Sequence, residues 1–436
     1  MSLPAFSVLE PLRRSGILRS VAMLVSAGGL GQLVLLLAMP IATRLYDPGD
    51  FGVAAVFGAL MAALLMVSSM RYELAVVLPR SEEHARALVR LCLSLTLATG
   101  VAVLAAVALW RSPVARDFGV PEMAEVLWLL PFAVVGAGAY RVFNFWSVRR
   151  EAFGRIAATR VLQPVSNAIV QVVLGLFHFG PAGLVAGQLA GTTVGGTGLA
   201  KGAQPWPVLR RGELVKWRIL ARRYARFPKY DVAAALLDTV SLQLPNLLLA
   251  RLFGAEIAGF YMLADRAIVV PLALLGQALG QVIYARSRDS VTDGSMLLVV
   301  VKTVKVLGVG VALLALAFIP LGPILFEIAF GEQWRTAGVF SSVLFLGFGT
   351  QFIFSSISLA LPASGGQPLN LAINALLLTV KCAALSYGYA VGSAFVAIAC
   401  YSAVTVLGNV IGIAVVIVHL QRQTPTSQSP GPAVNR

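Results

Sequence analysis

Charged residues are scarce in this chain. They make up 12% of its 436 residues, whereas hydrophobic residues make up 58%, and the mean hydropathy is +0.83. A soluble domain typically has about 25% charged and about 45 to 50% apolar residues. A soluble protein of this length would not have such a composition, which therefore predicts a polytopic membrane protein.

Motifs for metal, redox or nucleotide chemistry are also missing. Neither the cysteines nor the histidines have the spacing of a metal or redox motif, and no Gly-Lys-Ser/Thr sequence marks a P-loop. The longest loops expected on the outer side, 111–122 and 320–337, are too short for a catalytic domain. We therefore expect no cofactor, no metal and no enzymatic activity. The cysteines are Cys92, Cys382 and Cys400, and the histidines are His84, His178 and His419.

Long apolar stretches fill the rest of the chain. A hydrocarbon core of about 30 Å requires roughly 20 apolar residues in a helix, and twelve stretches meet this length. The sequence thus predicts an all-α protein with twelve transmembrane helices. The stretches cover residues 20–43, 52–78, 87–110, 123–147, 156–177, 181–200, 230–250, 259–284, 296–319, 338–361, 369–389 and 392–419.

A short motif occurs twice, 207 residues apart. Arg44-Leu45-Tyr46 with Gly52 matches Arg251-Leu252-Phe253 with Gly259, and a Phe-Gly pair follows each copy, at Phe118-Gly119 and Phe330-Gly331. Such a repeat indicates a duplicated membrane fold, and most duplicated membrane folds are transporters. We expect two homologous six-helix bundles with substrate between them. Their predicted bounds are 1–200 and 230–419, with a basic linker at 201–229 and a disordered tail at 420–436.

Basic residues predict the orientation, because cytoplasmic loops carry an excess of lysine and arginine. With the N-terminus inside, most of the 34 basic residues fall on cytoplasmic segments, and they are densest in the 201–229 linker. Both termini are then cytoplasmic, and the net charge of +15 is a topology signal, not a nucleic-acid footprint. The linker would lie on the membrane surface and attract anionic lipids, although an ordinary positive-inside linker has the same composition.

Four basic residues fall inside predicted spans. They are Lys381, near the middle of its span, Arg266, and Arg141 and Arg71, closer to the cytoplasmic interface. A charge at a helix centre costs roughly 2.5 to 3.5 kcal/mol by insertion scales and is kept mostly for function. The alternative is that these long side chains snorkel to the interface or pair internally.

Three carboxylates also fall inside predicted spans, namely Asp238, Asp265 and Glu73. A buried carboxylate that titrates near neutral pH could couple transport to protons or sodium. The alternative is that these residues are charge partners for the arginines. The spacing does not decide between the two. A further row of glycines at positions 183, 187, 191 and 195 predicts close helix packing, as do Gly276 and Gly280.

Together these segments resemble a known family of membrane proteins, the Wzx-type polysaccharide flippases of the multidrug/oligosaccharidyl-lipid/polysaccharide exporter superfamily. The resemblance extends over nearly the whole chain. It is carried by Arg44 to Gly52, Arg71-Tyr72-Glu73-Leu74-Ala75, Leu78-Pro79, Arg149-Arg150-Glu151-Ala152-Phe153, Gly183-Leu184-Val185-Ala186-Gly187-Gln188, Gly259-Phe260-Tyr261, and Phe330-Gly331 followed by Trp334.

The resemblance implies a two-lobed transporter in the inner membrane. Its substrate would be undecaprenyl-diphosphate-linked oligosaccharide, moved to the periplasmic leaflet for O-antigen, capsule or exopolysaccharide, with a glycan polymerase and chain-length machinery as further partners. Lys381, Arg266, Arg141 and Arg71 are then candidates for binding phosphate or acidic sugars, and Asp238, Asp265 and Glu73 for ion coupling. Two alternatives stay open: a cation-coupled drug or metabolite exporter of the same superfamily, and a non-transporting scaffold for glycan assembly.

Overall fold

A computed structural model describes residues 17–200, 213–272, 296–357 and 367–423 of the protein. Within these ranges every regular element is a helix. Each of the twelve predicted stretches overlaps at least one helix, and eight helices are long and apolar enough to cross a membrane. The prediction of an all-α polytopic membrane protein is therefore confirmed. Residues 201–212 of the linker, Gly276, Gly280 and the tail beyond residue 423 lie outside the described ranges.

The chain forms two compact units. The first comprises Met1–Met262 with Ala329–Trp334, and the second comprises Leu263–Ile328 with Arg335–Arg436. Residues 230–262 therefore belong to the first unit. The boundary between the compact units thus differs from the boundary between the lobes that the repeat predicts. The division into lobes at 1–200 and 230–419 stays a prediction from the repeat.

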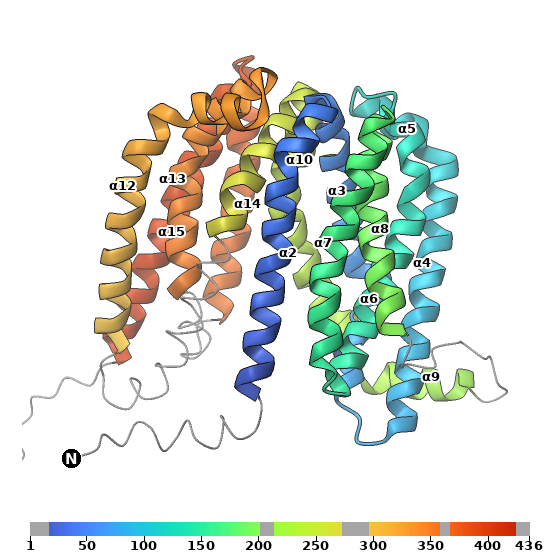
Figure 1. Ribbon diagram of the computed structural model, residues 1–436. Helices are drawn as coiled ribbons and strands as arrows, with labels where there is room; N and C mark the ends of the chain where they lie inside the picture. Colours follow the sequence, from blue (N-terminus) through green and yellow to red (C-terminus); the bar gives the residue numbers. More distant parts are fainter. Residues whose placement is uncertain (1–16, 201–212, 273–295, 358–366, 424–436) are drawn as a thin grey trace, which may run out of the picture. The chain divides into compact units, whose positions relative to one another are not determined.

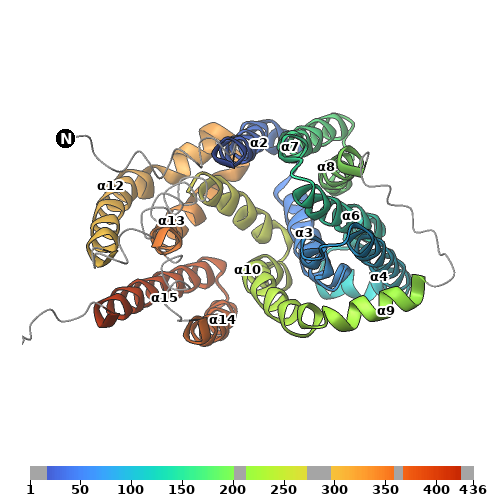
Figure 2. The same cartoon turned by 90° about the horizontal axis from the view of Figure 1, so that it is seen from below.

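Most of the described helices belong to the first unit (Figure 1). It contains α2 (Ile17–Leu45), α3 (Pro48–Ser68), η1 (Tyr72–Val77), α4 (Glu82–Asp117), α5 (Met123–Val126), η2 (Leu127–Leu129), α6 (Leu130–Arg149), α7 (Phe153–Leu176), α8 (Pro181–Ala200), α9 (Glu213–Arg223), η3 (Phe227–Asp231), α10 (Val232–Phe253) and η4 (Glu332–Trp334). The long helices α2, α4, α6, α7 and α8 run side by side, and α3 packs on α6, α8 and α10 (Figures 1 and 2).

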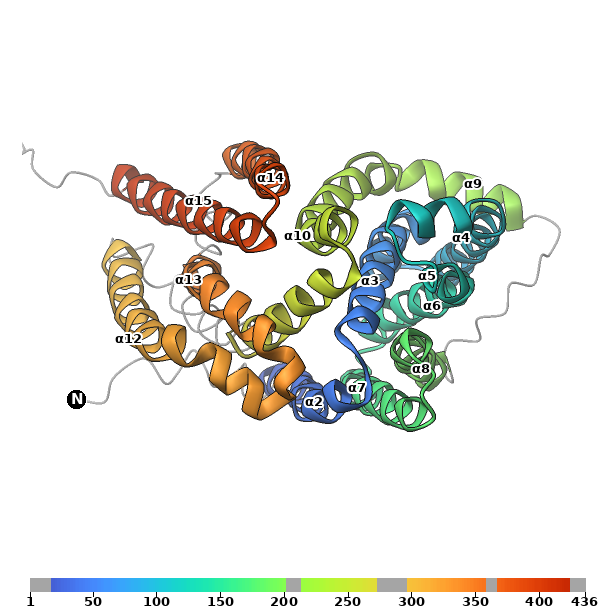
Figure 3. The ribbon, with the colours of Figure 1, turned by 90° about the horizontal axis from the view of Figure 1, so that it is seen from above.

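The second unit contains α13 (Arg335–Ile357), α14 (Gln367–Ala390), α15 (Ala394–Gln423) and nearly all of α12 (Met296–Phe330). α15 packs on both α13 and α14 (Figure 3). A small core joins α12, α13 and α15 through Val300, Ile357 and Val416. A further helix, residues 255–272, begins in the first unit and continues into the second.

The predicted glycine row on α8 is a packing surface, as expected. A Cβ added to Gly187 would lie 2.7 Å from Asn167 Oδ1, and one added to Gly195 would lie 2.1 Å from Gln163 Nε2. These two polar side chains are four residues apart on α7. Because the glycines of α8 have no side chains, the polar side chains of Gln163 and Asn167 on α7 can approach this helix closely.

The two copies of the repeated motif contact each other within the first unit. A Cβ added to Gly52 would lie 1.8 Å from the carbonyl oxygen of Ala255, and one added to Gly259 would lie 1.8 Å from that of Pro48. The 207-residue offset relates both the two glycines and the two carbonyls. The contact is thus reciprocal, as an internal two-fold relation requires. Only glycine, which has no Cβ, permits this approach.

The end of α2 supplies a second anchor in this region. The carbonyl of Thr43 lies in the last turn, where helix carbonyls have no partner within the helix. It accepts hydrogen bonds from Trp334 Nε1 and from Gln333 Nε2, each at 2.9 Å. Trp334 is fully buried and packs edge-on against Phe51, with ring centroids 4.9 Å apart. The motif that follows Phe330-Gly331 therefore closes the end of this helix.

Tyr46, in the first copy of the motif, also has a defined structural role. Its hydroxyl donates a hydrogen bond to the backbone carbonyl of Gln171 at 2.6 Å. Burial, with a smaller contribution from the charge of Asp50, raises the pKa of Tyr46 to about 12. The phenol therefore stays protonated, and a donor, at any physiological pH. It links the end of α2 to α7.

We expect Gly52→Ala to lower the stability of the purified protein by about 1 to 3 kcal/mol, because the new methyl group would overpack against the Ala255 carbonyl. Gly49→Ala is the matched control, since it lies on the same helix and a Cβ there meets nothing within 4 Å. Thermal unfolding in detergent checks both variants. Equal unfolding midpoints would show that the reciprocal contact does not constrain the fold.

Candidate functional site

Two of the predicted site residues form an ion pair inside the first unit. Arg141 Nη2 on α6 lies 3.5 Å from Glu73 Oε1 on η1, and the Glu73 side chain is 1% exposed. Ser69 Oγ donates a short hydrogen bond to the other carboxylate oxygen of Glu73. Arg141 Nη1 donates to the carbonyl of Leu65 at 3.2 Å. The carboxylate therefore has a cation and a hydroxyl as partners.

A break in the helix places Glu73 in this position. The stretch predicted at 52–78 as one span is divided: α3 ends at Ser68, and η1 begins at Tyr72. Met70 and Arg71 between them have φ values of 52° and 61°. Non-glycine residues adopt this left-handed region only when surrounding structure compensates the strain. The turn directs Glu73 toward α6. Arg71, which the sequence placed inside the predicted span 52–78, lies in this turn and not in a membrane-spanning helix.

Arg71 is the third member of this cluster. Its charge acts on Arg141, and within the described part of the chain its buried Nε atom has no hydrogen-bond partner. An unsatisfied buried donor is costly, so this nitrogen would gain a hydrogen bond to any anion that reached it. Two arginines and one carboxylate leave the cluster with a net positive charge.

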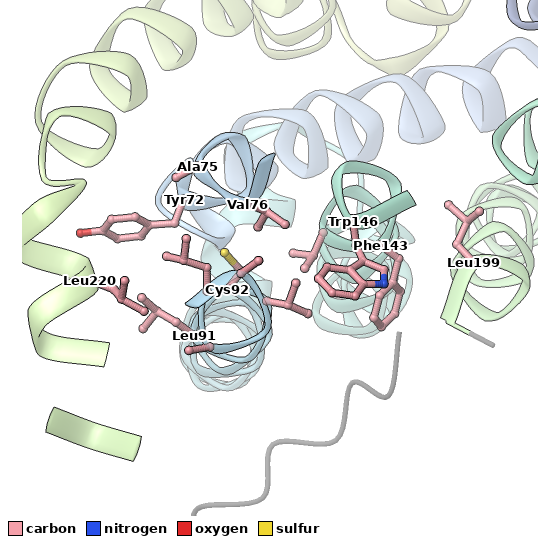
Figure 4. Close-up of a cluster of buried hydrophobic side chains, with 14 of the residues drawn as sticks. Tyr72, Ala75, Val76, Leu91, Cys92, Phe143, Trp146, Leu199 and Leu220 are labelled. Atoms are coloured by element: carbon pink, nitrogen blue, oxygen red, sulfur yellow. The ribbon is translucent and has the colours of Figure 1, made fainter. Parts of the chain in front are cut away.

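Tyr72 and Val142, next to the cluster in sequence, belong to an apolar core, which Figure 4 shows. Tyr72, Val76, Cys92, Phe143 and Trp146 are all buried there. Water is largely excluded by such side chains, so the attraction between Arg141 and Glu73 is stronger than at a surface, but so is the cost of leaving either one unpaired. Burial also raises the pKa of Tyr72, whose hydroxyl donates to the carbonyl of Ala221 at 3.1 Å.

Lys381 lies in the second unit, on α14, and is half-buried. Its ammonium nitrogen lies 5.4 Å from the centre of the Tyr401 ring on α15. A cation over an aromatic face is attracted by about 0.5 to 2 kcal/mol. This attraction offsets only part of the cost of a charge in a membrane and leaves the ammonium able to donate hydrogen bonds to an anion.

Asp265 and Arg266 are partly buried in the helix at 255–272, also in the second unit. Adjacent residues of a helix do not face each other, and within the described residues no ion pair joins these two. Asp238 is exposed on α10 in the first unit. The structure thus brings Arg71, Glu73 and Arg141 together and distributes the other four candidates over three different helices.

Two contributing residues escaped the sequence analysis. Ser69 lies four residues before Glu73, a spacing that allows side-chain contact and was therefore a usable signal. Tyr401 under Lys381 gave no such signal, because the two residues are on different helices. Among the described residues no group of three or more His, Cys, Asp and Glu side chains could hold a metal ion.

The ion pair predicts an ordering of stabilities. Arg141→Ala leaves the Glu73 charge buried without its cation and should cost about 3 to 5 kcal/mol. The double variant Arg141→Ala with Glu73→Gln should recover part of this loss, because the uncompensated charge is then absent. Arg155→Ala, at an exposed arginine of the same unit, is the control and should have little effect. Additive losses in thermal unfolding would show that the two side chains do not interact.

Comparisons with known proteins identify the fold. The lipid II flippase MurJ, in an inward closed conformation, has a TM-score of 0.70 at 11% identity, over 93% of this chain and 90% of that chain. An inward-facing multidrug resistance MATE family transporter of the MOP superfamily has a TM-score of 0.60 at 15% identity, over 93% and 96%. At such low identity these likenesses show a shared fold.

Sequence comparison adds the family. Succinoglycan biosynthesis transport protein ExoT of Rhizobium meliloti (strain 1021) is 28% identical over 327 residues, which are 71% of this chain and 62% of that protein. The chain thus spans less than two thirds of this relative's length. The family model described as polysaccharide biosynthesis protein matches residues 41–338. The resemblance found in the sequence is confirmed, and the chain belongs to the polysaccharide biosynthesis protein family.

Proposed function

We propose that this protein flips undecaprenyl-diphosphate-linked oligosaccharide from the cytoplasmic to the periplasmic leaflet of the inner membrane, by alternating access, for O-antigen, capsule or exopolysaccharide synthesis. The observation that carries the proposal is the family match across residues 41–338 of a multi-pass helical protein. The name of the succinoglycan transport relative and the fold shared with a lipid II flippase support it.

The chemistry of the substrate fits the buried cations. A lipid-linked diphosphate carries roughly two negative charges, and an unpaired charge is far too costly to cross hydrocarbon unaided. In the proposed mechanism Arg141 and Arg71 bind phosphate or acidic sugar in the first unit, with bidentate geometry. Lys381 and Arg266 supply cations in the second unit. The protein itself breaks no covalent bond.

Orientation and partners follow from the same proposal. Both termini face the cytoplasm, because the basic residues then lie on the inner side. The repeat at Arg44 and Arg251 then marks the periplasmic ends of two homologous lobes. A glycan polymerase and chain-length machinery would receive the product on that side.

A cation-coupled exporter is the second candidate, supported by the fold shared with a multidrug transporter. Such a protein needs carboxylates that exchange protons or sodium. Glu73 suits this role poorly, since it already forms an ion pair with Arg141 and accepts a hydrogen bond from Ser69. Asp265 and Asp238 are the better coupling candidates, because neither has an ion pair in the described part of the chain.

We expect Lys381→Ala to abolish export of surface glycan in cells while the protein still inserts and folds. Lys305→Ala, at an exposed lysine of the same unit, is the matched control and should leave export unchanged. Arg266→Lys should reduce export less than Arg266→Ala, since lysine keeps the charge but loses the planar fork. Surface polymer at the wild-type level in Lys381→Ala would remove Lys381 from the site.

Alternating access predicts that the two repeat junctions separate in one state. Asp47 precedes Pro48, and Ala255 contacts Gly52, so both positions border the reciprocal contact. Cysteines at Asp47 and Ala255, in a chain lacking the native three, should crosslink in a state-dependent way and block export when joined. Normal export by fully crosslinked protein would contradict movement at this contact while leaving the family assignment intact.

A further inference from the structure

We propose that α9 and η3 form a membrane-surface element that binds the anionic phospholipids of the adjoining leaflet. On the topology proposed above this is the cytoplasmic leaflet. The inference uses that topology only to name the leaflet. It does not depend on which substrate the protein carries.

One face of α9 is joined to the first unit. Leu220 is 4% exposed in the apolar core that also contains Tyr72 and Leu91, and Trp217 packs against this core. The carbonyl of Ala221 accepts the hydrogen bond from Tyr72, and Lys216 Nζ lies 2.5 Å from Glu83 Oε1 at the start of α4. These contacts fix the rotation of α9 about its own axis.

The opposite face of α9 exposes both aliphatic side chains and arginines. Contact with water alone would not favour exposure of the aliphatic ones. Leu214, Val215 and Ile219 are 61 to 62% exposed, and the exposed Arg218 and Arg222 lie among them. Residues four apart share a helix face, so the arginines continue the row that begins at Leu214, and Val215 and Ile219 form the row beside it. A row of aliphatic side chains beside a row of arginines is typical of helices that lie in a membrane interface.

The direction of α9 agrees with this placement. In Figure 1 it lies across the end of α4 instead of continuing along it, and it packs on that helix. A helix that crosses the end of a membrane-spanning helix lies in the plane of the membrane surface. Its exposed apolar side chains can then enter the headgroup region while the arginines bind lipid phosphates.

The basic surface continues past α9. Arg226, Lys229 and Tyr230, with Ala225, line an open hollow of about 530 Å³ beside η3. Two cations and a phenol around it suit a phosphate-bearing headgroup.

A protein partner fits this face less well. A stable protein interface buries about 800 Å² on each side, more than the outer face of an eleven-residue helix provides. The exposed charged residues on this face, Arg218 and Arg222, are both positive, and each basic residue near an anionic membrane surface is worth about a fivefold change in binding. The favoured occupant is therefore a lipid surface.

The test uses the full chain in nanodiscs, in a cysteine-free background with a spin label at residue 219 (Ile219→Cys). In discs containing anionic phosphatidylglycerol, the label should be accessible to oxygen and shielded from a water-soluble nickel reagent. In discs of phosphatidylcholine alone, the label should be less shielded from the nickel reagent. The variant Arg218→Gln with Arg222→Gln should weaken the binding of anionic phospholipid by α9 roughly 25-fold. The control Arg80→Gln with Arg155→Gln removes two exposed arginines elsewhere in the unit and should change nothing.

Three outcomes would overturn the proposal. High exposure to the nickel reagent in both kinds of disc would show that this face meets water. Shielding that is independent of lipid charge would show purely apolar insertion. Shielding in detergent without lipid would show that protein covers the face.

Native mass spectrometry of phosphatidylglycerol retained by cysteine-containing protein gives the same comparison without labels, so a poorly folded cysteine-free chain does not prevent the test. Loss of lipid binding with normal glycan export would leave the proposed function standing.

Discussion

A carboxylate within an apolar core requires a positive partner, and Glu73 is the clearest case in this protein. Its side chain is 1% exposed and has Arg141 and Ser69 as partners. An uncompensated charge there would cost several kcal/mol, a large share of the 5 to 15 kcal/mol by which proteins are typically stable. The turn after α3, the inward position of Arg141 on α6 and the packing of η1 are all arranged around this pair.

The backbone before Glu73 is strained. Met70 and Arg71 adopt left-handed conformations without being glycine, at an expected cost of about 1 to 3 kcal/mol each. Nothing in their side chains favours such a turn. Tertiary packing must compensate the strain, because a continuous helix through residues 68–72 would not place Glu73 in the same orientation relative to Arg141. Strain of this kind is common where a fixed geometry matters more than local stability.

Sequence alone predicted the helices well, because membrane spans are set by length and apolarity. It also found the repeat, and the reciprocal contact of Gly52 with Ala255 and of Gly259 with Pro48 explains why these glycines recur. The break at Ser68 was not predictable, since no glycine or proline marks it. The sequence also left Glu73 open as either an ion-coupling group or a partner for an arginine, because only the fold brings η1 and α6 together. For the same reason it could not place Lys381 against Tyr401.

The two charge-bearing regions of the first unit are physically connected. Tyr72 donates its hydrogen bond to α9, and the next residue along η1 is Glu73, which pairs with Arg141. A shift of α9 must therefore either break the bond from Tyr72 or move η1 with it. In the second case the distance between Glu73 and Arg141 changes, and with it the availability of the arginine to another anion. The exposed arginines of α9 and the buried acid of η1 thus belong to two elements that this hydrogen bond joins. A single hydrogen bond and one peptide unit therefore separate the two regions.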